Sequence, residues 1–247
     1  MTPKQGMNEN FFISQKWINE KYIQGHSKPN IGSAVPAGSS GPSPSFGGSF
    51  REANKSSHQS LPDSFDWRAK GVVNPIEDQG NCGSCWIFAA LAVVESANAI
   101  AMNPLMELSE QQVMDCVKPP HYESNGCQGG TADDAYSFVQ QFGVVTSKVY
   151  PYTGSVGKCL EMVPYWGVSI TGYNFLPINT TDNEIMWTIY NKGPVAAILN
   201  AGDREFQLYN GGVLTSPGSR DLYGDYNHYI SIVGWGNDGG YDYWIVR

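Results

Sequence analysis

Cys85 is the clearest chemical feature of this sequence, because it stands where a helix is expected to begin. Ser84 before it is a typical N-cap residue, and the Ala-rich stretch after it lacks Gly and Pro. In the first turn of a helix, unpaired N–H groups and the helix dipole stabilise a thiolate. The Gln79 side chain, shortly upstream, is a candidate amide donor to an oxyanion. This arrangement is typical of a cysteine nucleophile that attacks a carbonyl group.

His228 is the candidate base for that nucleophile. Of the other histidines, His26 and His58 lie in an N-terminal segment of different composition, and His121 lies in a polar loop. A histidine at the start of a strand is by itself more often structural than catalytic. Its combination with Cys85 favours a catalytic pair.

Cys82 and Cys85 also fit two other interpretations of a Cys-x-x-Cys sequence, a redox pair or half of a zinc site. A redox motif needs a βαβ context and a zinc site needs a second close pair of Cys or His ligands, and the sequence supplies neither. We therefore expect no metal and no cofactor. Five cysteines leave one thiol free, and the other four allow three pairings.

Six segments in one order resemble the papain and cathepsin family of cysteine proteases. Cys-Gly-Ser-Cys-Trp at residues 82–86 is the local signature of the catalytic cysteine in that family. Residues 61–68 are similar to the start of the mature domain, and residues 108–116 are similar to its second helix. Later segments follow in family order at residues 125–130, 207–212 and 227–236. The resemblance covers residues 61–247.

The resemblance implies roles for three catalytic residues. Cys85 would attack as a thiolate, His228 would protonate the leaving amine, and the Gln79 amide with the Cys85 N–H would hold the oxyanion. His228 follows Cys85 by roughly 140 residues, inside the family range of roughly 130 to 150. The resemblance also implies two disulfides, Cys82–Cys127 and Cys116–Cys159.

Four residues correspond to peptide-binding positions of the family: Gly129, Gly130, Ile198 and Tyr229. The glycines would let an extended peptide approach the backbone, although a turn would also explain them. The family usually has a small residue at the position of Tyr229. With Ile198 in the wall, we expect a narrow pocket that prefers small or medium apolar side chains over Phe two positions upstream of the cut.

The resemblance implies an α+β, two-lobed papain-like fold with the active site in a cleft between the lobes. Residues 61–164 are expected to form a helical lobe with helices over residues 84–102, 109–116 and 131–142. Ser109 followed by Gln112 is a capping-box pattern. Residues 165–247 are expected to form an incomplete, barrel-like β lobe with strands over residues 195–199, 229–233 and 241–246.

Residues 1–60 differ in composition, and we interpret them as a propeptide remnant and a Gly/Ser/Pro-rich linker. Residues 11–22 have loosely helical spacing, typical of a propeptide helix or of an ordinary terminal helix. Residues 32–48 are expected to be a flexible linker that tolerates an activating cut, which would remove the chain up to about Gln59 or Ser60. Because the first residues lack an apolar signal core, we expect a longer precursor.

The family continues beyond the position of Arg247 with Asn-Ser-Trp, in which the Asn orients the histidine. We therefore expect a C-terminally truncated protease with exposed sheet edges and impaired activity. The main hypothesis is a cysteine-type endopeptidase, and the short interval between Cys116 and Cys127 favours it over an exopeptidase because it argues against a cleft-blocking insertion there. The alternative is an inactive homologue or truncated product that binds peptides or inhibitors.

Composition limits the partners of this chain. The 247 residues are 41% hydrophobic, enough to fill a core, and only 15% charged, with a net charge of −8. This balance argues against nucleic acid, and no apolar run reaches the roughly 18 residues of a membrane span. Cysteine usage and two glycosylation sequons fit a lysosomal or extracellular protein. We expect a monomer that meets peptide or protein substrates and protein inhibitors of cysteine proteases.

Overall fold

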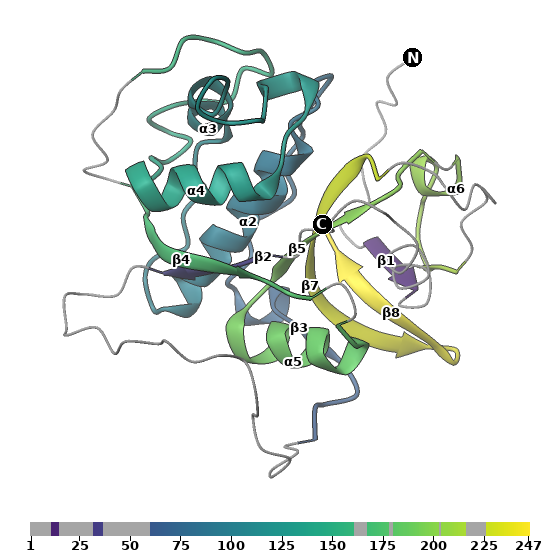
Figure 1. Cartoon of the computed structure of the whole chain (residues 1–247). Helices are drawn as coiled ribbons and strands as arrows, with labels where there is room; N and C mark the ends of the chain where they lie inside the picture. The colour runs from purple at the N-terminus through teal and green to yellow at the C-terminus, as the bar shows by residue number, and fades with distance from the viewer. Residues whose placement is uncertain are drawn as a thin grey trace.

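Two hydrophobic cores, one mainly helical and one mainly of strands, organise the chain (Figure 1). The computed structural model describes residues 11–14, 32–36, 60–160, 167–177, 180–202, 204–215 and 226–247, with the backbone alone for the first two segments. Figure 1 shows three helices on one side, α2 (Cys85–Ile100), α3 (Glu110–Cys116) and α4 (Ala132–Phe142). On the other side lie the long strands β7 (His228–Asp238) and β8 (Tyr241–Val246). This arrangement agrees with the expected α+β, two-lobed fold.

Helix α2 is the centre of the helical lobe. It is rich in Ala, the best helix former, and contains neither Gly nor Pro. Nearly all of its residues are buried, so neighbours surround it instead of covering a single stripe. The helices predicted over residues 84–102, 109–116 and 131–142 are confirmed to within two residues at each end.

Side-chain caps begin the two shorter helices of this lobe. The Ser109 hydroxyl accepts a hydrogen bond from the Gln112 N–H at 3.0 Å and so begins α3. The capping box predicted here is only half formed, because the Gln112 side chain accepts from the buried Val145 N–H at 2.8 Å instead. That amide would otherwise lose a partner, which costs more than the second half of the box contributes. Thr131 begins α4 by accepting from the Asp134 N–H.

Among the described residues, the strands form one eight-stranded sheet in the order β4-β2-β5-β7-β8-β1-β6, with β3 paired to β7. Its central antiparallel strands are β5 (Val195–Leu199), β7 and β8. The strands predicted over residues 195–199 and 241–246 are confirmed, and the one predicted over 229–233 is part of the longer β7. The remaining described strands are β1 (Phe11–Ser14), β2 (Gly32–Pro36), β3 (Phe65–Asp66), β4 (Ile170–Phe175) and β6 (Val213–Leu214).

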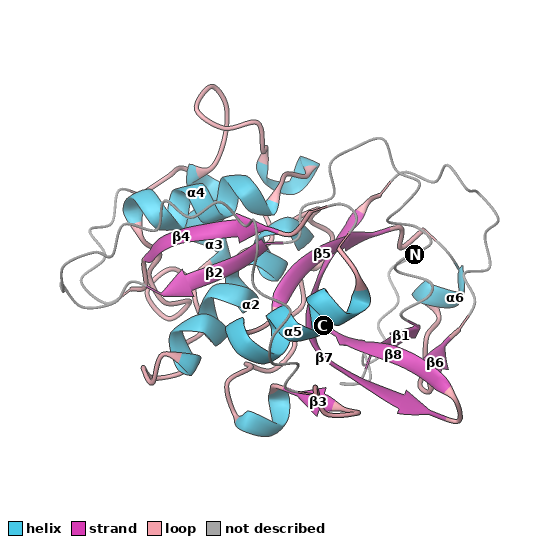
Figure 2. Cartoon of the chain, turned by 60° about the horizontal axis from the view of Figure 1, so that its bottom comes forward, coloured by secondary structure: helices cyan, strands magenta, loops and turns pink. Residues whose placement is uncertain are grey.

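Helix α5 (Asp182–Lys192) covers the sheet and was not predicted. It begins with a complete capping box between Thr181 and Glu184. Its buried residues Ile185 and Ile189, one turn apart, pack into the core of the β lobe. Figure 2 shows α5 beside strands β5 and β7.

The helix predicted over residues 11–22 is wrong for Phe11–Ser14, which form strand β1. This strand pairs antiparallel with β8 and parallel with β6. The edge of β8 that we expected to be exposed is therefore covered. A sheet edge offers a row of unpaired N–H and C=O groups, and pairing there outweighs the weak tendency of a short segment to form a helix. Residues 15–22 lie outside the described residues.

The flexible linker predicted over residues 32–48 is wrong for Gly32–Pro36, which form strand β2 between β4 and β5. Backbone pairing on both sides orders a segment whose composition alone predicts no structure. The rest of this predicted linker and the predicted cut near Gln59 lie outside the described residues.

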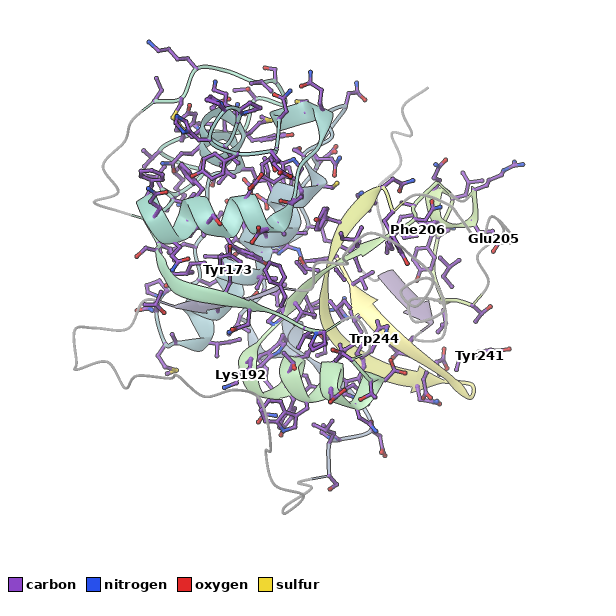
Figure 3. All side chains as sticks on the ribbon, viewed as in Figure 1. Tyr173, Lys192, Glu205, Phe206, Tyr241 and Trp244 are labelled. Atoms are coloured by element: carbon purple, nitrogen blue, oxygen red, sulfur yellow. A yellow bond between two sulfur atoms is a disulfide. The ribbon has the colours of Figure 1, made fainter. Side chains whose placement is uncertain are left out.

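Strand β4 joins the sheet to the helical lobe through Tyr173. Its hydroxyl donates to Asp133 Oδ1 at 2.6 Å and also bonds the Ser137 hydroxyl at 2.8 Å. Figure 3 shows Tyr173 on β4, below helix α4, which carries both partners.

Among the described residues, no helix is long and apolar enough to cross a membrane.

Candidate active site

Cys85 is the first residue of α2, and it is the free cysteine of the chain. The other four cysteines form the disulfides Cys82–Cys127 and Cys116–Cys159. Cys82 is therefore bonded across to η2 (Gly126–Gln128) and forms no redox pair with Cys85. The Gly83 N–H donates to the Cys127 carbonyl at 3.0 Å, and a Cβ at Gly83 would lie 2.5 Å from that oxygen. The loop that leads into Cys85 is thus fixed on its inner side.

Ser84 occupies the N-cap position of α2, but its side chain does not cap the helix. Its hydroxyl instead lies 2.7 Å from the hydroxyl of Tyr152, which donates to the Gln79 carbonyl at 2.9 Å. Ser84 therefore occupies the predicted N-cap position but does not form the capping hydrogen bond, because its buried hydroxyl bonds Tyr152 in a neighbouring loop. No local sequence pattern indicates Tyr152, since this contact joins segments far apart in the chain.

Burial sets the electrostatics of the Cys85 thiol. It raises the pKa above the ordinary value of 9.0, and the backbone N–H groups of Tyr229, Trp86 and Cys85 itself oppose this rise without cancelling it. The N–H groups at the helix terminus favour the thiolate, as expected from the sequence. Burial has the larger effect, however, so the net change in the thiol pKa is a rise. A thiolate at this position requires a further positive charge nearby.

His228 is the first residue of β7 and is half-buried. Its pKa is lowered, because burial penalises the imidazolium form. The ring packs edge-on against Phe206 of α6 (Arg204–Gln207), with centroids 6.1 Å apart and planes at 74°. Figure 3 labels Phe206 on α6, above the strands of the β lobe. Sequence patterns did not identify Phe206, whose short helix carries no recognisable motif.

Strand β7 brings His228 to the start of helix α2. The backbone N–H of Tyr229, the next residue, acts to lower the pKa of the Cys85 thiol. Further along, the Ser231 hydroxyl donates to the Ala89 carbonyl at 3.0 Å. Four helical residues rise about 6 Å and two strand residues about 6.6 Å, so the two elements run in step. Among the described residues, no direct hydrogen bond joins the Cys85 thiol and the His228 ring.

Gln79 lies half-buried in the loop before α2, and its side-chain N–H₂ group donates to the Cys82 carbonyl at 2.8 Å. A primary amide has two N–H donors, so this bond fixes the group and leaves a second donor for another acceptor. The Tyr152 hydroxyl holds the carbonyl of the same residue. Both the side chain and the backbone of Gln79 are thus restrained.

Gly129 and Gly130 follow η2, and a different structural feature favours glycine at each of the two positions. Gly129 has a φ of +111°, with open space where a Cβ would lie. At Gly130 a Cβ would lie 2.4 Å from Ser124 Oγ and 2.6 Å from Trp86 Cε2. Backbone conformation therefore selects the first glycine and close packing the second, so each has a structural reason beyond any role toward a ligand.

Ile198 and Tyr229 are cross-strand partners on β5 and β7. Opposite residues of an antiparallel pair point to the same face of a sheet. The Tyr229 ring is buried, with 8% of its surface exposed, in the core that α2 also joins, and the half-exposed Ile198 packs against that core. The ring thus fills space that a small residue would leave open.

Three carboxyl groups and one arginine meet where α2, α3 and the end of β8 come together. Oxygens of Glu77, Glu95 and Glu110 lie within 4.8 Å of one another, and Arg247 Nη2 lies 3.8 Å from Glu77 Oε2. Burial is the main cause that raises the pKa of Glu95, to about 7, and it also raises that of Glu110. Because Arg247 already supplies a positive charge here, we assign no metal. The sequence did not reveal this cluster, since its members are distant in the chain.

Comparison with known proteins matches this geometry to one family. The profile of the papain family cysteine proteases matches residues 61–247. Vignain of Vigna mungo is 42% identical over 191 residues, covering 76% of this chain and 50% of vignain. Zingipain-2 of Zingiber officinale is 39% identical over 188 residues, covering 76% of this chain and 80% of zingipain-2. The chain spans about half the length of several curated relatives that it matches.

Solved structures of cysteine proteases also superpose on this chain. A structure from a study of antibody cross-reactivity between the mite allergens Blo t 1 and Der p 1 superposes with a TM-score of 0.73 at 36% identity, covering 80% of this chain and 64% of the other. Bromelain of Ananas comosus in complex with the E64 inhibitor superposes with a TM-score of 0.67 at 36% identity, covering 76% and 82%. The α+β, two-lobed fold expected from the sequence is confirmed. The chain belongs to the papain family of cysteine proteases.

Proposed function

We propose that this protein hydrolyses internal peptide bonds through a Cys–His acyl-enzyme mechanism, with Cys85 as nucleophile and His228 as its acid–base partner. The observation that carries the proposal is the contact between strand β7 and helix α2, where the Ser231 hydroxyl donates to the Ala89 carbonyl at 3.0 Å, because it brings the strand that begins with His228 against the helix that begins with Cys85. Cys85 belongs to the helical lobe and His228 to the strand lobe. The reactive pair therefore exists only when the two lobes pack together.

The reaction begins with a proton transfer from the Cys85 thiol to the His228 ring. Burial raises the pKa of the thiol and lowers that of the imidazole, so each charge is unfavourable alone and each stabilises the other. The thiolate then attacks the scissile carbonyl carbon, and the carbonyl π electrons move to oxygen. The imidazolium donates its proton to the departing amine as the C–N bond breaks.

Two donors are proposed to hold the developing oxyanion. They are the Cys85 backbone N–H at the start of α2 and the second side-chain N–H of Gln79. A donor of this kind contributes about 2.7 to 4 kcal/mol to the transition state in other hydrolases. In the second half of the reaction His228 takes a proton from water, hydroxide attacks the thioester, and the thiol leaves with the peptide acid released.

An extended peptide is proposed to lie along Gly129 and Gly130, with the side chain two positions upstream of the cut against Ile198 and Tyr229. The open space beside Gly129 supports backbone approach there. The burial of the Tyr229 ring, with 8% of its surface exposed, supports a proposed pocket of small depth. The site therefore suits small or medium apolar side chains better than Phe.

The wider setting of this activity is also proposed. Two disulfides fit an oxidising compartment, so we place the protein in a lysosome-like compartment or outside the cell, as a monomer that meets protein substrates and protein inhibitors of cysteine proteases. Residues 1–60 are proposed as propeptide and linker, removed near Ser60, ahead of the peptidase domain over residues 61–247.

Labelling with E64 tests the proposed function. The reagent is an epoxide that traps a cysteine-protease thiolate, and bromelain, a structural neighbour, binds it. We expect one equivalent to attach at Cys85, as shown by peptide mass mapping, together with hydrolysis of a fluorogenic peptide. Cys85→Ala is the matched control and should lose both. A folded protein that neither labels nor hydrolyses the peptide would support the inactive homologue instead.

A further inference from the structure

Tyr152 connects the two residues that flank the loop before the nucleophile. Its hydroxyl donates to the Gln79 carbonyl at 2.9 Å and lies 2.7 Å from the Ser84 hydroxyl. A phenol has a single O–H, and the Gln79 carbonyl can only accept, so the Ser84 hydroxyl donates to Tyr152. A directed chain of hydrogen bonds therefore runs from the residue before Cys85, through Tyr152, to the residue that carries the candidate oxyanion amide.

The surroundings hold this chain in one arrangement. Ser84 is fully buried, so its hydroxyl depends on Tyr152 for a partner. The Tyr152 ring packs edge-on against Phe88, about one turn into α2, with centroids 5.1 Å apart. Burial raises the pKa of the phenol above its ordinary value of 10.0, so the O–H that must donate remains protonated. The ring thus rests on the catalytic helix while its hydroxyl holds the adjoining loop.

We propose that Tyr152 is a positioning residue that keeps the Gln79 amide in register with the Cys85 N–H, so that both donors meet the same oxyanion. The inference rests on the proposed function and deepens it. The loop between the two donors carries Gly80 at a φ of +64° and the Cys82–Cys127 disulfide. The disulfide and the Gly83 bond fix its inner side, and Tyr152 fixes its ends.

Tyr152→Phe is the direct test, because it removes one hydroxyl and keeps the ring against Phe88. Misplacement of a donor weakens the transition state more than the bound substrate, so we expect kcat for a fluorogenic peptide to fall by about tenfold with KM unchanged within about twofold. Affinity for a peptide aldehyde, whose hemithioacetal oxygen needs the oxyanion donors, should fall by a similar factor. The rate at which iodoacetamide alkylates Cys85 needs no oxyanion and should stay the same.

Tyr150→Phe is the matched control. The Tyr150 hydroxyl donates to Asp115 Oδ2 at 2.7 Å and bonds neither Gln79 nor Ser84, so this variant also loses a phenolic hydrogen bond but leaves the chain through Tyr152 intact. It should lower the melting temperature at least as much as Tyr152→Phe while leaving kcat and aldehyde affinity unchanged.

Ser84→Ala tests the same chain of hydrogen bonds from its other end, and it serves alone where Tyr152→Phe does not fold. We expect the same selective loss of kcat, and no further loss in the double variant, because either change breaks the one connection. Additive losses, or equal losses in Tyr150→Phe, would overturn the inference. Wild-type protein without turnover or Cys85 labelling would overturn the proposed function itself, and the inference with it.

Discussion

The Ser231 hydroxyl donates a buried hydrogen bond to the Ala89 carbonyl at 3.0 Å, joining strand β7 to helix α2. The bond lies two residues beyond Tyr229 and one helical turn beyond Cys85. It therefore fixes the register in which the strand that carries His228 passes the helix that carries the nucleophile. This contact between the two elements, and no local sequence property, determines how the strand that begins with His228 lies against the helix that begins with Cys85.

Ser231→Ala should loosen that register. We expect a loss of about 1 kcal/mol in the free energy of unfolding, because the Ala89 carbonyl keeps its helical partner and only one hydrogen bond disappears. Activity toward a peptide should fall more than this loss of stability explains, since the strand can then slide relative to Cys85. Urea unfolding and steady-state kinetics measure the two effects.

Ser96→Ala is a matched control on the same helix. The Ser96 hydroxyl is buried without a partner among the described residues, so its removal should change stability by no more than about 0.5 kcal/mol and leave activity intact. If Ser231→Ala and Ser96→Ala behave alike, the contact between β7 and α2 does not set the site.

The contribution of Glu95 to stability should fall as the pH rises from acidic to neutral. Burial raises the pKa of Glu95 from 4.5 to about 7, so this carboxyl group binds its proton more tightly in the folded chain than in the unfolded chain. Its contribution is complete below pH 4.5 and is lost as the pH rises through about 7, with a slope of at most about 1.4 kcal/mol per pH unit. Glu110 and Glu77, whose pKa values are also raised, act in the same direction.

Urea titrations between pH 4.5 and 8 measure this slope, and Glu95→Gln is the control that isolates one carboxyl group. The variant should keep the hydrogen bond that Glu95 accepts from the Leu108 N–H at 2.7 Å, and its stability should depend less on pH than that of the wild type. Equal slopes in the two proteins would show that Glu95 does not carry a raised pKa.

Specificity should follow the size of the proposed pocket. Because Tyr229 is buried beneath the half-exposed Ile198, we expect Val and Leu two positions upstream of the cut to be cleaved better than Phe. Ile198→Ala should narrow this difference, since it removes side-chain volume from the wall without opening the core. Profiling with a peptide library measures both, and a clear preference of the wild type for Phe would contradict the pocket assignment.

The sequence predicted those parts of the fold that local patterns determine. The Gly- and Pro-free run after Cys85 predicted α2, and dense apolar runs predicted β5 and β8. It did not predict α5, although Thr181 followed by Glu184 is a capping box, because the helix turns few apolar residues to the core. Strand β1 was predicted as a helix, since its pairing depends on an edge formed by residues at the other end of the chain.

For the candidate site, too, the sequence predicted some features and missed others. Cys85, His228 and Gln79 were found from residue type, order and spacing. The hydroxyl of Ser84 was assigned to the wrong partner, because its true partner, Tyr152, is reached only through the folded chain. The thiol pKa was misjudged because burial depends on the packing of both lobes, which helix position alone does not describe.

The pH dependence of Cys85 alkylation by iodoacetamide, compared between wild type and His228→Ala, tests the central claim most directly. Because the other four cysteines are in disulfides, the reaction reports on this thiol alone. We expect rapid alkylation of the wild type well below pH 9.0, through the thiolate–imidazolium pair, and alkylation of the variant only above pH 9.0, where the buried thiol ionises unaided. Identical profiles in the two proteins would contradict the assignment of His228 as the partner of Cys85.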